Sequence, residues 1–387
     1  MNNTKRSKLT NRFWFQLHGW FSLPLWILFC FIALTGSIAS ISHELTWLTN
    51  PNARATNPDS VSAKSPDDII QIVQQAHPSA DISGMSTFEP YLVNAVLFSD
   101  KDKPFAIAYV NQYTGEIQEI NTGTTFITFM RSLHGWLLFP WHHGYSVGYY
   151  LVSLFSLLLM GAVVTGMIVY KKFWRAFFQF KLRFHQGGRT FLSDLHRLCG
   201  VWSIWFMIIM SLTGLWYLIQ AVMWHNDVEI DPYPNIIPVE HIPMQKTSVP
   251  NAAERVKTAL AAAKATYPDF ELSYMMLPEH NRDTLKLYGS GNDIFYDNFS
   301  YVVAVDPWSG NVTHELSPDN MNLTQSVMHI ADPLHFGYIG GLWTKFIWFF
   351  FGLVLSGMML SGFLMWRKRV ITPKAKRPAT QNKEVIS

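Results

Sequence analysis

The stretch Leu195-His196-Arg197-Leu198-Cys199-Gly200 opens a long apolar run that ends in Leu212-Thr213-Gly214. A second copy lies earlier in the chain, where Leu17-His18-Gly19-Trp20 leads to Leu34-Thr35-Gly36. In both copies, 18 residues separate the histidine from the glycine. Eighteen residues make about five turns of α-helix and rise about 27 Å, which is close to the thickness of a hydrocarbon core. We therefore expect each copy to form one membrane helix with its histidine and glycine on the same face.

The composition agrees with a chain that is partly in a membrane. Of its 387 residues, 49% are hydrophobic and only 15% are charged, whereas about 25% of the residues of a soluble domain are charged. The net charge of +3 is small and gives no reason to expect a nucleic-acid partner. Both cysteines, Cys30 and Cys199, lie inside apolar runs, so a Cys-x-x-Cys metal or redox site is excluded.

Four apolar runs are long enough to cross a bilayer. Basic residues cluster before the first run, between the second and third, and after the fourth, and the positive-inside rule makes that side cytoplasmic. Both termini are then expected in the cytoplasm. The expected segments are a cytoplasmic tail at 1–12, a first membrane helix at 13–42, a periplasmic domain at 43–130, a boundary segment and second helix at 131–170, a basic cytoplasmic loop at 171–195, a third helix at 196–224, a second periplasmic domain at 225–332, a boundary segment and fourth helix at 333–366, and a basic cytoplasmic tail at 367–387.

The two long connections repeat one plan. Each begins with a helical pattern, at Asp67–Ala76 in the first and Asn251–Thr266 in the second, and continues in strand-like runs. The segment Asn111–Ile117 then matches Asp306–Val312 position for position. This recurrence predicts an internal duplication, in which each half contains a helix, an outer domain and a second helix.

Four of the fourteen histidines follow a leucine at a membrane boundary. His18 and His196 are expected on the cytoplasmic side, and His134 and His335 on the outer side, so each side receives one imidazole from each half. Two facing imidazoles are what six-coordinate haem iron needs for its axial positions. The neighbouring residues are mainly Trp, Phe, Leu and Gly, whereas a zinc or copper site would draw on Cys, Asp or Glu as well.

Small residues beside these histidines favour a flat apolar ligand. Gly200 belongs to a small-residue stripe on the helix of His196, and Gly36 and Gly214 are expected to make room beside the outer histidines. Arg131 and Lys345 at the outer boundary are candidate cations for haem propionates. The alternative interpretation stays open that the small residues serve only helix packing and the cations only snorkel to the interface.

Three further groups of polar residues are candidates for a role at these sites. The insertion Pro140-Trp141-His142-His143 has no counterpart before the fourth helix, so His142 or His143 is a rival outer ligand to His134. Asp194 is expected either to cap the third helix or to accept the second N–H of His196. His329 is a candidate to line an outer pocket.

The outer domains, which close on Tyr113-Thr114-Gly115 and Trp308-Ser309-Gly310, resemble PepSY domains. Together with the Leu-His…Thr-Gly helices, the chain resembles the PepSY-associated transmembrane proteins over essentially its full length except the tails. That family includes bacterial inner-membrane reductases that remove iron from ferric siderophores, such as the ferrioxamine B reductase. The resemblance implies an α-helical membrane protein with four transmembrane helices, two PepSY-like α+β periplasmic domains and two haem b groups.

The expected function is therefore a ferric-siderophore or other ferric-chelate reductase of the bacterial inner membrane, which releases Fe(II). No residue resembles a general acid, base or nucleophile, which agrees with outer-sphere electron transfer. A Gly-rich dinucleotide fingerprint is absent from the sequence, so quinol or a separate cytoplasmic reductase is the expected electron donor. Two other functions stay open: a haem subunit that feeds another periplasmic reductase, for instance of methionine sulfoxide, and a non-enzymatic PepSY sensor or protease regulator.

Overall fold

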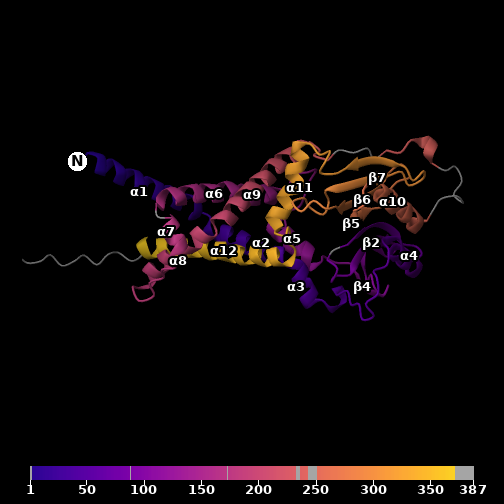
Figure 1. The fold of residues 1–387 in the computed structure, drawn as a ribbon, viewed down its shortest axis with the longest axis horizontal. Coiled ribbons are helices and arrows are strands. Elements are labelled where there is room, and N and C mark those ends of the chain that lie inside the picture. Colours follow the sequence, from indigo (N-terminus) through magenta and orange to yellow (C-terminus); the bar gives the residue numbers. More distant parts are fainter. Residues whose placement is uncertain (1, 88, 172, 232–235, 243–250, 371–387) are drawn as a thin grey trace, which may run out of the picture. The chain divides into compact units, whose positions relative to one another are not determined.

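The computed structural model describes residues 2–87, 89–171, 173–231, 236–242 and 251–370. Of the basic tail expected at 367–387, residues 371–387 therefore lie outside the described residues. The chain divides into two compact units (Figure 1). The first, called the helical unit below, comprises Met1–Leu34, Leu157–Ile208 and Phe351–Ser387. The second, called the sheet unit, comprises Thr35–Ser156 and Ile209–Phe350. Each unit is described by itself.

Three helices are long and apolar enough to cross a membrane: α6 (Val147–Val169), α9 (Ile204–His225) and α12 (Leu342–Val370). Helices α1 (Asn2–Ser22) and α2 (Trp26–Ser40) pass the same test as a pair, with a bend of 62° between them. The protein is thus of the membrane type, with three candidate spans among the described residues, or four if the bent pair is one span. Such apolar helices imply a lipid bilayer around them.

The first apolar run does not form the uninterrupted helix that we expected. His18 lies on α1 and Gly36 on α2, and the helix breaks between Ser22 and Trp26. Pro24 gives the physical reason, because proline lacks the backbone N–H and disfavours helical geometry in the residue before it. The expectation that His18 and Gly36 share one helical face is therefore wrong.

The third apolar run is also interrupted. His196 lies on α8 (Gly188–Trp202), whereas Gly214 lies on α9, which begins after Ser203. The hydroxyl of Ser203 donates a hydrogen bond to the carbonyl oxygen of Cys199, four residues earlier. Back-bonding of this kind commonly bends helices. The estimate of five continuous turns is wrong in this copy as well.

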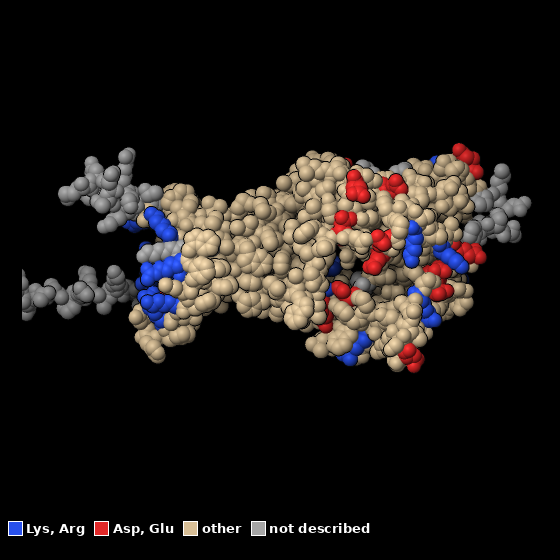
Figure 2. All heavy atoms as spheres, viewed as in Figure 1, with Lys and Arg blue, Asp and Glu red and all other residues tan. Residues whose placement is uncertain are grey.

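The helical unit is strongly basic. Among its described residues Asp194 is the only carboxylate, and Figure 2 shows Lys and Arg gathered around α7 (Phe173–Phe178), α8 and the end of α12. The basic residues in that region include Arg175, Lys181, Arg183, Arg189, Arg197, Arg367, Lys368 and Arg369.

The sheet unit contains an eight-stranded antiparallel sheet in the order β4-β3-β2-β1-β5-β6-β7-β8. Each half of the chain contributes a helix followed by four strands, but the two sets form one sheet because β1 pairs with β5, with Met85 opposite Met275. The two small α+β domains expected at 43–130 and 225–332 therefore share a single sheet. The strands are β1 (Asp81–Ser86), β2 (Asn94–Asp100), β3 (Lys103–Val110), β4 (Ile117–Asn121), β5 (Glu271–Met276), β6 (Leu285–Ser290), β7 (Tyr301–Val305) and β8 (Val312–Leu316).

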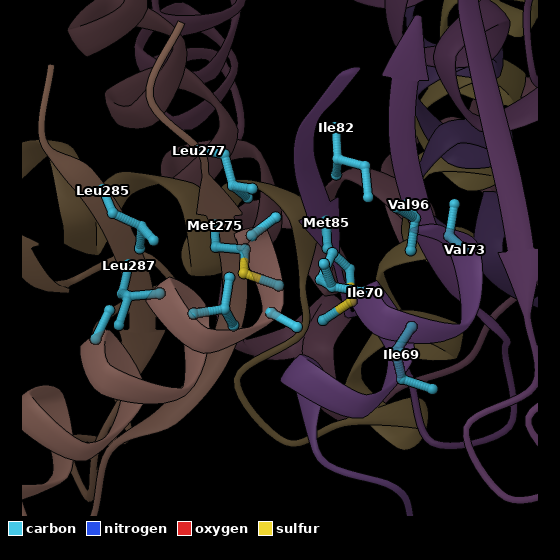
Figure 3. Packing of buried hydrophobic residues seen from close by; sticks show 14 of the residues in the cluster. Ile69, Ile70, Val73, Ile82, Met85, Val96, Met275, Leu277, Leu285 and Leu287 are labelled. Atoms are coloured by element: carbon cyan, nitrogen blue, oxygen red, sulfur yellow. The ribbon is translucent and has the colours of Figure 1, made fainter. Parts of the chain in front are cut away.

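Helices α4 (Pro66–Ala76) and α10 (Ala252–Thr266) pack on this sheet and enclose its main core. Ile69, Ile70 and Val73 form the apolar stripe of α4 and are fully buried, as are Met85 and Met275 at the junction of the two halves (Figure 3). Burying one such side chain contributes about 1.5–3 kcal/mol. The junction between β1 and β5 is thus held by side chains of the hydrophobic core as well as by strand pairing.

The repeated turn has the same geometry in both halves. The side chain of Asn111 accepts a hydrogen bond of 2.9 Å from the N–H of Tyr113, and the side chain of Asp306 accepts one of 2.9 Å from the N–H of Trp308. Gly115 and Gly310 follow with φ angles of 81° and 74°, a region that favours glycine. The sequence match between these segments thus reflects one local structure used twice.

Two helices that were not expected follow the strands. Helix α5 (Phe126–Trp136) carries His134, and α11 (Leu323–Phe336) carries His335. Thr125 caps α5 by accepting from the N–H of Thr128, and Asn322 caps α11 by accepting from the N–H of Gln325. Both histidines are therefore held on regular helices. The remaining elements are α3 (Ser42–Thr49), η1 (Pro51–Ala53) and η2 (Val239–His241).

Candidate functional site

In the helical unit, His18 of α1 faces His196 of α8. Their ring centroids are 6.4 Å apart, and the ring planes stand at 81° to each other. Both residues are partly buried. The structure thus brings together the two histidines that the sequence assigned to the cytoplasmic side.

Both rings line a cavity of about 730 Å³, within the usual range for sites that hold small molecules and cofactors. Its walls are mainly apolar, and Gly200 is among the residues that line it. Three cations, Arg189, Arg197 and Arg369, also line it. This cavity therefore suits a large apolar ligand that carries a few acidic groups.

The Nδ1 atom of each of these two histidines contacts a hydroxyl group. His18 Nδ1 lies 3.0 Å from the carbonyl oxygen of Ala162 and 3.1 Å from Oγ1 of Thr165. His196 Nδ1 lies 3.0 Å from Oγ of Ser361. The contacts hold each ring by its Nδ1 edge.

In the sheet unit, His134 faces His335. Their ring centroids are 6.1 Å apart, and the planes are inclined at 31°. Oγ1 of Thr213 lies 2.8 Å from Nδ1 of His335, and Oγ1 of Thr35 lies 3.5 Å from Nδ1 of His134. The second pair therefore has the same kind of hydroxyl contact as the first.

Glycines adjoin three of the four rings. A Cβ atom on Gly36 would lie 2.7 Å from the ring of His134, so only glycine fits there without displacing that ring. A Cβ on Gly166 would lie 3.3 Å from His18, and one on Gly362 would lie 3.7 Å from His196.

The expectation for Gly214 is wrong. A Cβ there would meet Ser156 at 2.9 Å. From α9, Thr213 contacts Nδ1 of His335, and the ring of Tyr217 lies edge-on to His335 with the centroids 5.0 Å apart.

These contacts follow one rule that was not expected from the sequence. Each histidine is approached by a Ser/Thr-Gly dipeptide from another part of the chain, and in three cases the glycine also adjoins the ring. The dipeptides are Thr165-Gly166 for His18, Thr35-Gly36 for His134, Ser361-Gly362 for His196 and Thr213-Gly214 for His335. All four dipeptides lie in apolar runs of the sequence, but a role beside the histidines was expected only for Gly36 and Gly214.

His142 and His143, the rival outer ligands, are exposed in the turn before α6, where His142 forms a backbone bridge with Tyr145. The ring beside His335 is that of His134.

The two pairs have a spacing that fits axial ligands of haem. A metal–imidazole bond of about 2 Å and a further ~1 Å from the nitrogen to the ring centre put two rings on one metal about 6 Å apart between centroids. The measured separations are 6.4 and 6.1 Å. Among the described residues, no group of three or more His, Cys, Asp or Glu side chains is arranged to hold a bare metal ion.

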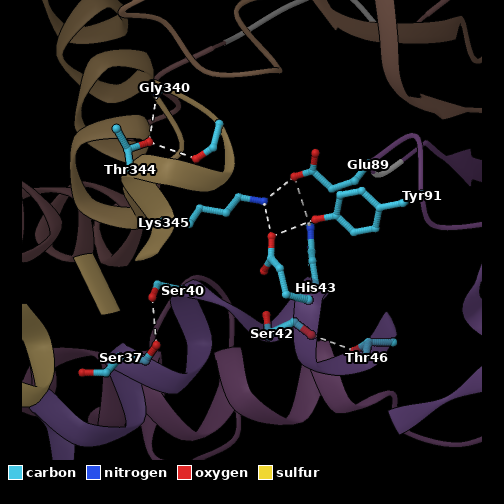
Figure 4. A network of polar contacts seen from close by, with 12 residues as sticks. Ser37, Ser40, Ser42, His43, Thr46, Glu89, Tyr91, Gly340, Thr344 and Lys345 are labelled. Carbon is cyan, nitrogen blue, oxygen red and sulfur yellow. Dashed lines mark hydrogen bonds and ion pairs between the residues drawn. The ribbon is translucent and has the colours of Figure 1, made fainter. Parts of the chain in front are cut away.

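Two of the charged residues singled out above have other partners. Lys345 is buried and forms ion pairs with Glu44 and Glu89 (Figure 4), so the expectation that it faces a propionate is wrong. Asp194 binds Arg183 and Arg197 instead of His196, whose Nδ1 contacts Ser361. In both cases a nearby opposite charge outweighs the expected partner.

Arg131 remains compatible with its expected place beside the outer pair. Its guanidinium lies 5.8 Å from the ring centroid of Phe336, the neighbour of His335.

His329 forms a separate buried cluster in the sheet unit. Its Nδ1 lies 2.8 Å from Asp297 and its Nε2 lies 3.3 Å from Asp231. Burial lowers the pKa of His329, but the hydrogen bonds and charges of the two carboxylates outweigh this and raise the pKa to about 9. His329 is thus an imidazolium held between carboxylates.

The spans, the antiparallel sheet and the paired histidines define a membrane protein with helical spans and a separate sheet region, whose histidines meet in pairs. Comparison with known families gives the particular group: the chain belongs to the family described as the PepSY-associated TM region, which matches residues 15–369. The family expected from the sequence is confirmed. No curated protein matches the chain.

Proposed function

We propose that this protein is a dihaem electron-transfer protein of the bacterial inner membrane that reduces a ferric siderophore or similar ferric chelate. The observation that carries the proposal is the pairing of histidines, with ring centroids 6.4 Å apart in the helical unit and 6.1 Å apart in the sheet unit. Both separations agree with two imidazoles on one iron. Two independent pairs with this spacing favour two haems over isolated structural histidines.

Different residues of the chain would hold different parts of each haem. Haem b between two histidines has no open coordination position and carries one electron at a time. His18 with His196, and His134 with His335, would supply the axial nitrogens. The apolar walls of the 730 Å³ cavity would keep water from the ring. Arg189 and Arg369 would pair with propionates at the first site, whereas Arg197 is already paired with Asp194. Arg131 is the candidate at the second site.

The direction of transfer in this proposal rests on charge. The described helical unit contains many basic residues and a single acid, Asp194, and basic segments stay on the cytoplasmic side of spans. The helical-unit pair then serves the cytoplasmic side, where quinol or a separate reductase donates electrons. The sheet-unit pair serves the periplasmic side.

Reduction of the proposed ferric chelate requires only that the protein hold the chelate and deliver one electron. One electron converts Fe(III) to Fe(II), which binds hard oxygen ligands less tightly because its charge density is lower. The sheet unit would have to hold the chelate near His134 and His335 while the electron passes. No proton transfer from a catalytic side chain is required for that step.

The test is a spectrum of the full chain, purified in detergent from haem-replete cells. We expect sharp bands of low-spin haem b after reduction, and oxidation of that haem by ferrioxamine B, with Fe(II) captured by a coloured chelator. The matched gallium(III) siderophore, which cannot accept an electron under these conditions, should leave the haem reduced. Methionine sulfoxide should also leave it reduced. A colourless preparation, or oxidation by methionine sulfoxide but not by the ferric chelate, would contradict the proposal.

A further inference from the structure

The hydroxyl groups beside the histidines indicate which ring nitrogen of each imidazole carries the proton, because each hydroxyl has only one hydrogen to donate. The hydroxyl of Thr213 donates a hydrogen bond of 2.8 Å to the carbonyl oxygen of Ile209. Its oxygen, 2.8 Å from Nδ1 of His335, must then act as the acceptor of that contact. It follows that Nδ1 of His335 carries the proton, and that Nε2 is the nitrogen with the free lone pair.

The same reasoning applies to His196. The hydroxyl of Ser361 donates to the carbonyl oxygen of Met358 at 2.9 Å, and its oxygen lies 3.0 Å from Nδ1 of His196. Nδ1 of His196 is therefore also the protonated nitrogen.

Two contacts of His18 indicate that its Nδ1 carries the proton. The hydroxyl of Thr165 donates to the carbonyl oxygen of Gly161 at 2.6 Å, so its oxygen accepts from Nδ1 of His18. The carbonyl oxygen of Ala162, 3.0 Å from the same Nδ1, is an acceptor only. Three residues from separate parts of the chain thus impose the same tautomer.

We infer that Thr213, Ser361 and Thr165 are positioning residues that fix the Nδ1–H tautomer and the ring orientation of His335, His196 and His18, so that each presents Nε2 to iron. The inference rests on the proposed function, because it concerns ligands of the proposed haems. Partners of the second ring nitrogen commonly set the tautomer, orientation and basicity of a ligating histidine. Here the partners include a neutral hydroxyl whose own hydrogen is bound to the preceding turn of its helix. His18 and His196 each have a backbone carbonyl partner as well.

The variants of these hydroxyl residues should shift the haem potential by different amounts. Thr213→Val removes the acceptor from His335 at nearly constant volume. A weaker acceptor makes the imidazole a poorer electron donor to iron, so the potential of that haem should shift to a more positive value. Thr165→Val should have a smaller effect, because His18 keeps the carbonyl oxygen of Ala162. Thr213→Ser, which restores the hydroxyl, should return the potential towards that of the wild type.

The experiment compares these variants of the full, haem-loaded chain in one detergent. Haem content is measured first, followed by redox titration and low-temperature paramagnetic resonance of the oxidised protein. Ser153→Ala is the matched control, because the Ser153 hydroxyl donates to the backbone of its own helix at Tyr149 and is not among the hydroxyls that contact these histidines. That variant should leave the potentials and the resonance signals unchanged.

The outcomes are distinguishable. Unchanged haem content with a positive shift and a changed resonance signal in Thr213→Val, reversed in Thr213→Ser, supports the inference. Identical potentials and signals in the wild type and Thr213→Val would overturn it. If Thr213→Val fails to load haem, Ser361→Ala decides the question, and an unchanged potential and resonance signal in that variant would also overturn the inference. Absence of haem from the wild type would refute the proposed function instead.

Discussion

The imidazole of His18 stands at 81° to that of His196, whereas the plane of His134 is inclined at only 31° to that of His335. The two pairs have nearly the same separation, so they differ mainly in the angle between their planes. This angle has a measurable consequence for any iron between the rings.

We expect the oxidised, haem-loaded protein to give two low-spin resonance signals. Near-perpendicular imidazole planes leave two iron d orbitals almost degenerate, which produces a signal with an unusually large greatest g value. Planes at 31° separate those orbitals and give an ordinary rhombic signal. Low-temperature paramagnetic resonance measures both, and His196→Ala should remove only the large-g signal. A single signal type in the wild type would contradict this geometry.

The second prediction tests whether His134 and His335 are the outer haem ligands, as opposed to His142 or His143. Under the proposed function, replacement of His335 by alanine should lower the haem content from about two to about one per chain, because one of the proposed axial nitrogens is lost. His142→Ala and His143→Ala are matched controls, since both residues are exposed in the turn before α6. The measurement is haem per protein in the purified variants. Loss of haem in a control but not in His335→Ala would reverse the assignment.

The third prediction concerns the contact between α2 and His134. Gly36→Ala introduces a Cβ that would lie 2.7 Å from the ring of His134, so that ring has to move. We expect loss or marked perturbation of the sheet-unit haem signal and retention of the other one. Gly135→Ala is the control, because a Cβ there meets no atom within 4 Å. Equal spectra for Gly36→Ala and the wild type would show that this ring is not held where the structure has it.

The fourth prediction concerns pH and does not depend on haem. The pKa of His329 is raised to about 9 in the fold, above its unfolded value of about 6.5. The native state therefore binds more protons than the unfolded state between these two values, so stability falls as pH rises from about 6.5 to 9, by roughly 3 kcal/mol at most. Below pH 6.5 this contribution is fully present.

Amide hydrogen exchange of α11 checks this prediction, after correction for the intrinsic pH dependence of exchange. The opening free energy of α11 should decline across this range in the wild type. In His329→Gln the decline should be much weaker, because the titrating group is gone. A wild-type opening free energy that stays constant or increases from pH 6.5 to 9 would contradict the raised pKa.

The sequence by itself determined the features that depend on local composition. Apolar length alone gave the candidate membrane spans, because crossing a hydrocarbon core needs about 20 apolar residues in a row. The helix-and-strand order of both halves followed from periodicity, and the repeated turn followed from residues such as Asn111 and Gly115 that its geometry requires. Leucine followed by histidine at the ends of apolar runs also drew attention to four residues that the structure brings together in two pairs.

The tertiary structure alone decided which distant residues meet. Met85 and Met275 join the two halves into one sheet, and no local pattern predicts a pairing across that much sequence. Thr213 and His335 are 122 residues apart, yet their contact decides which nitrogen carries the proton. Asp194 and Lys345 form ion pairs with Arg183 and Glu44, which were not the partners expected from the sequence. Contacts of this kind arise only after helices and strands have packed, because their free energy depends on the distance and burial of both partners.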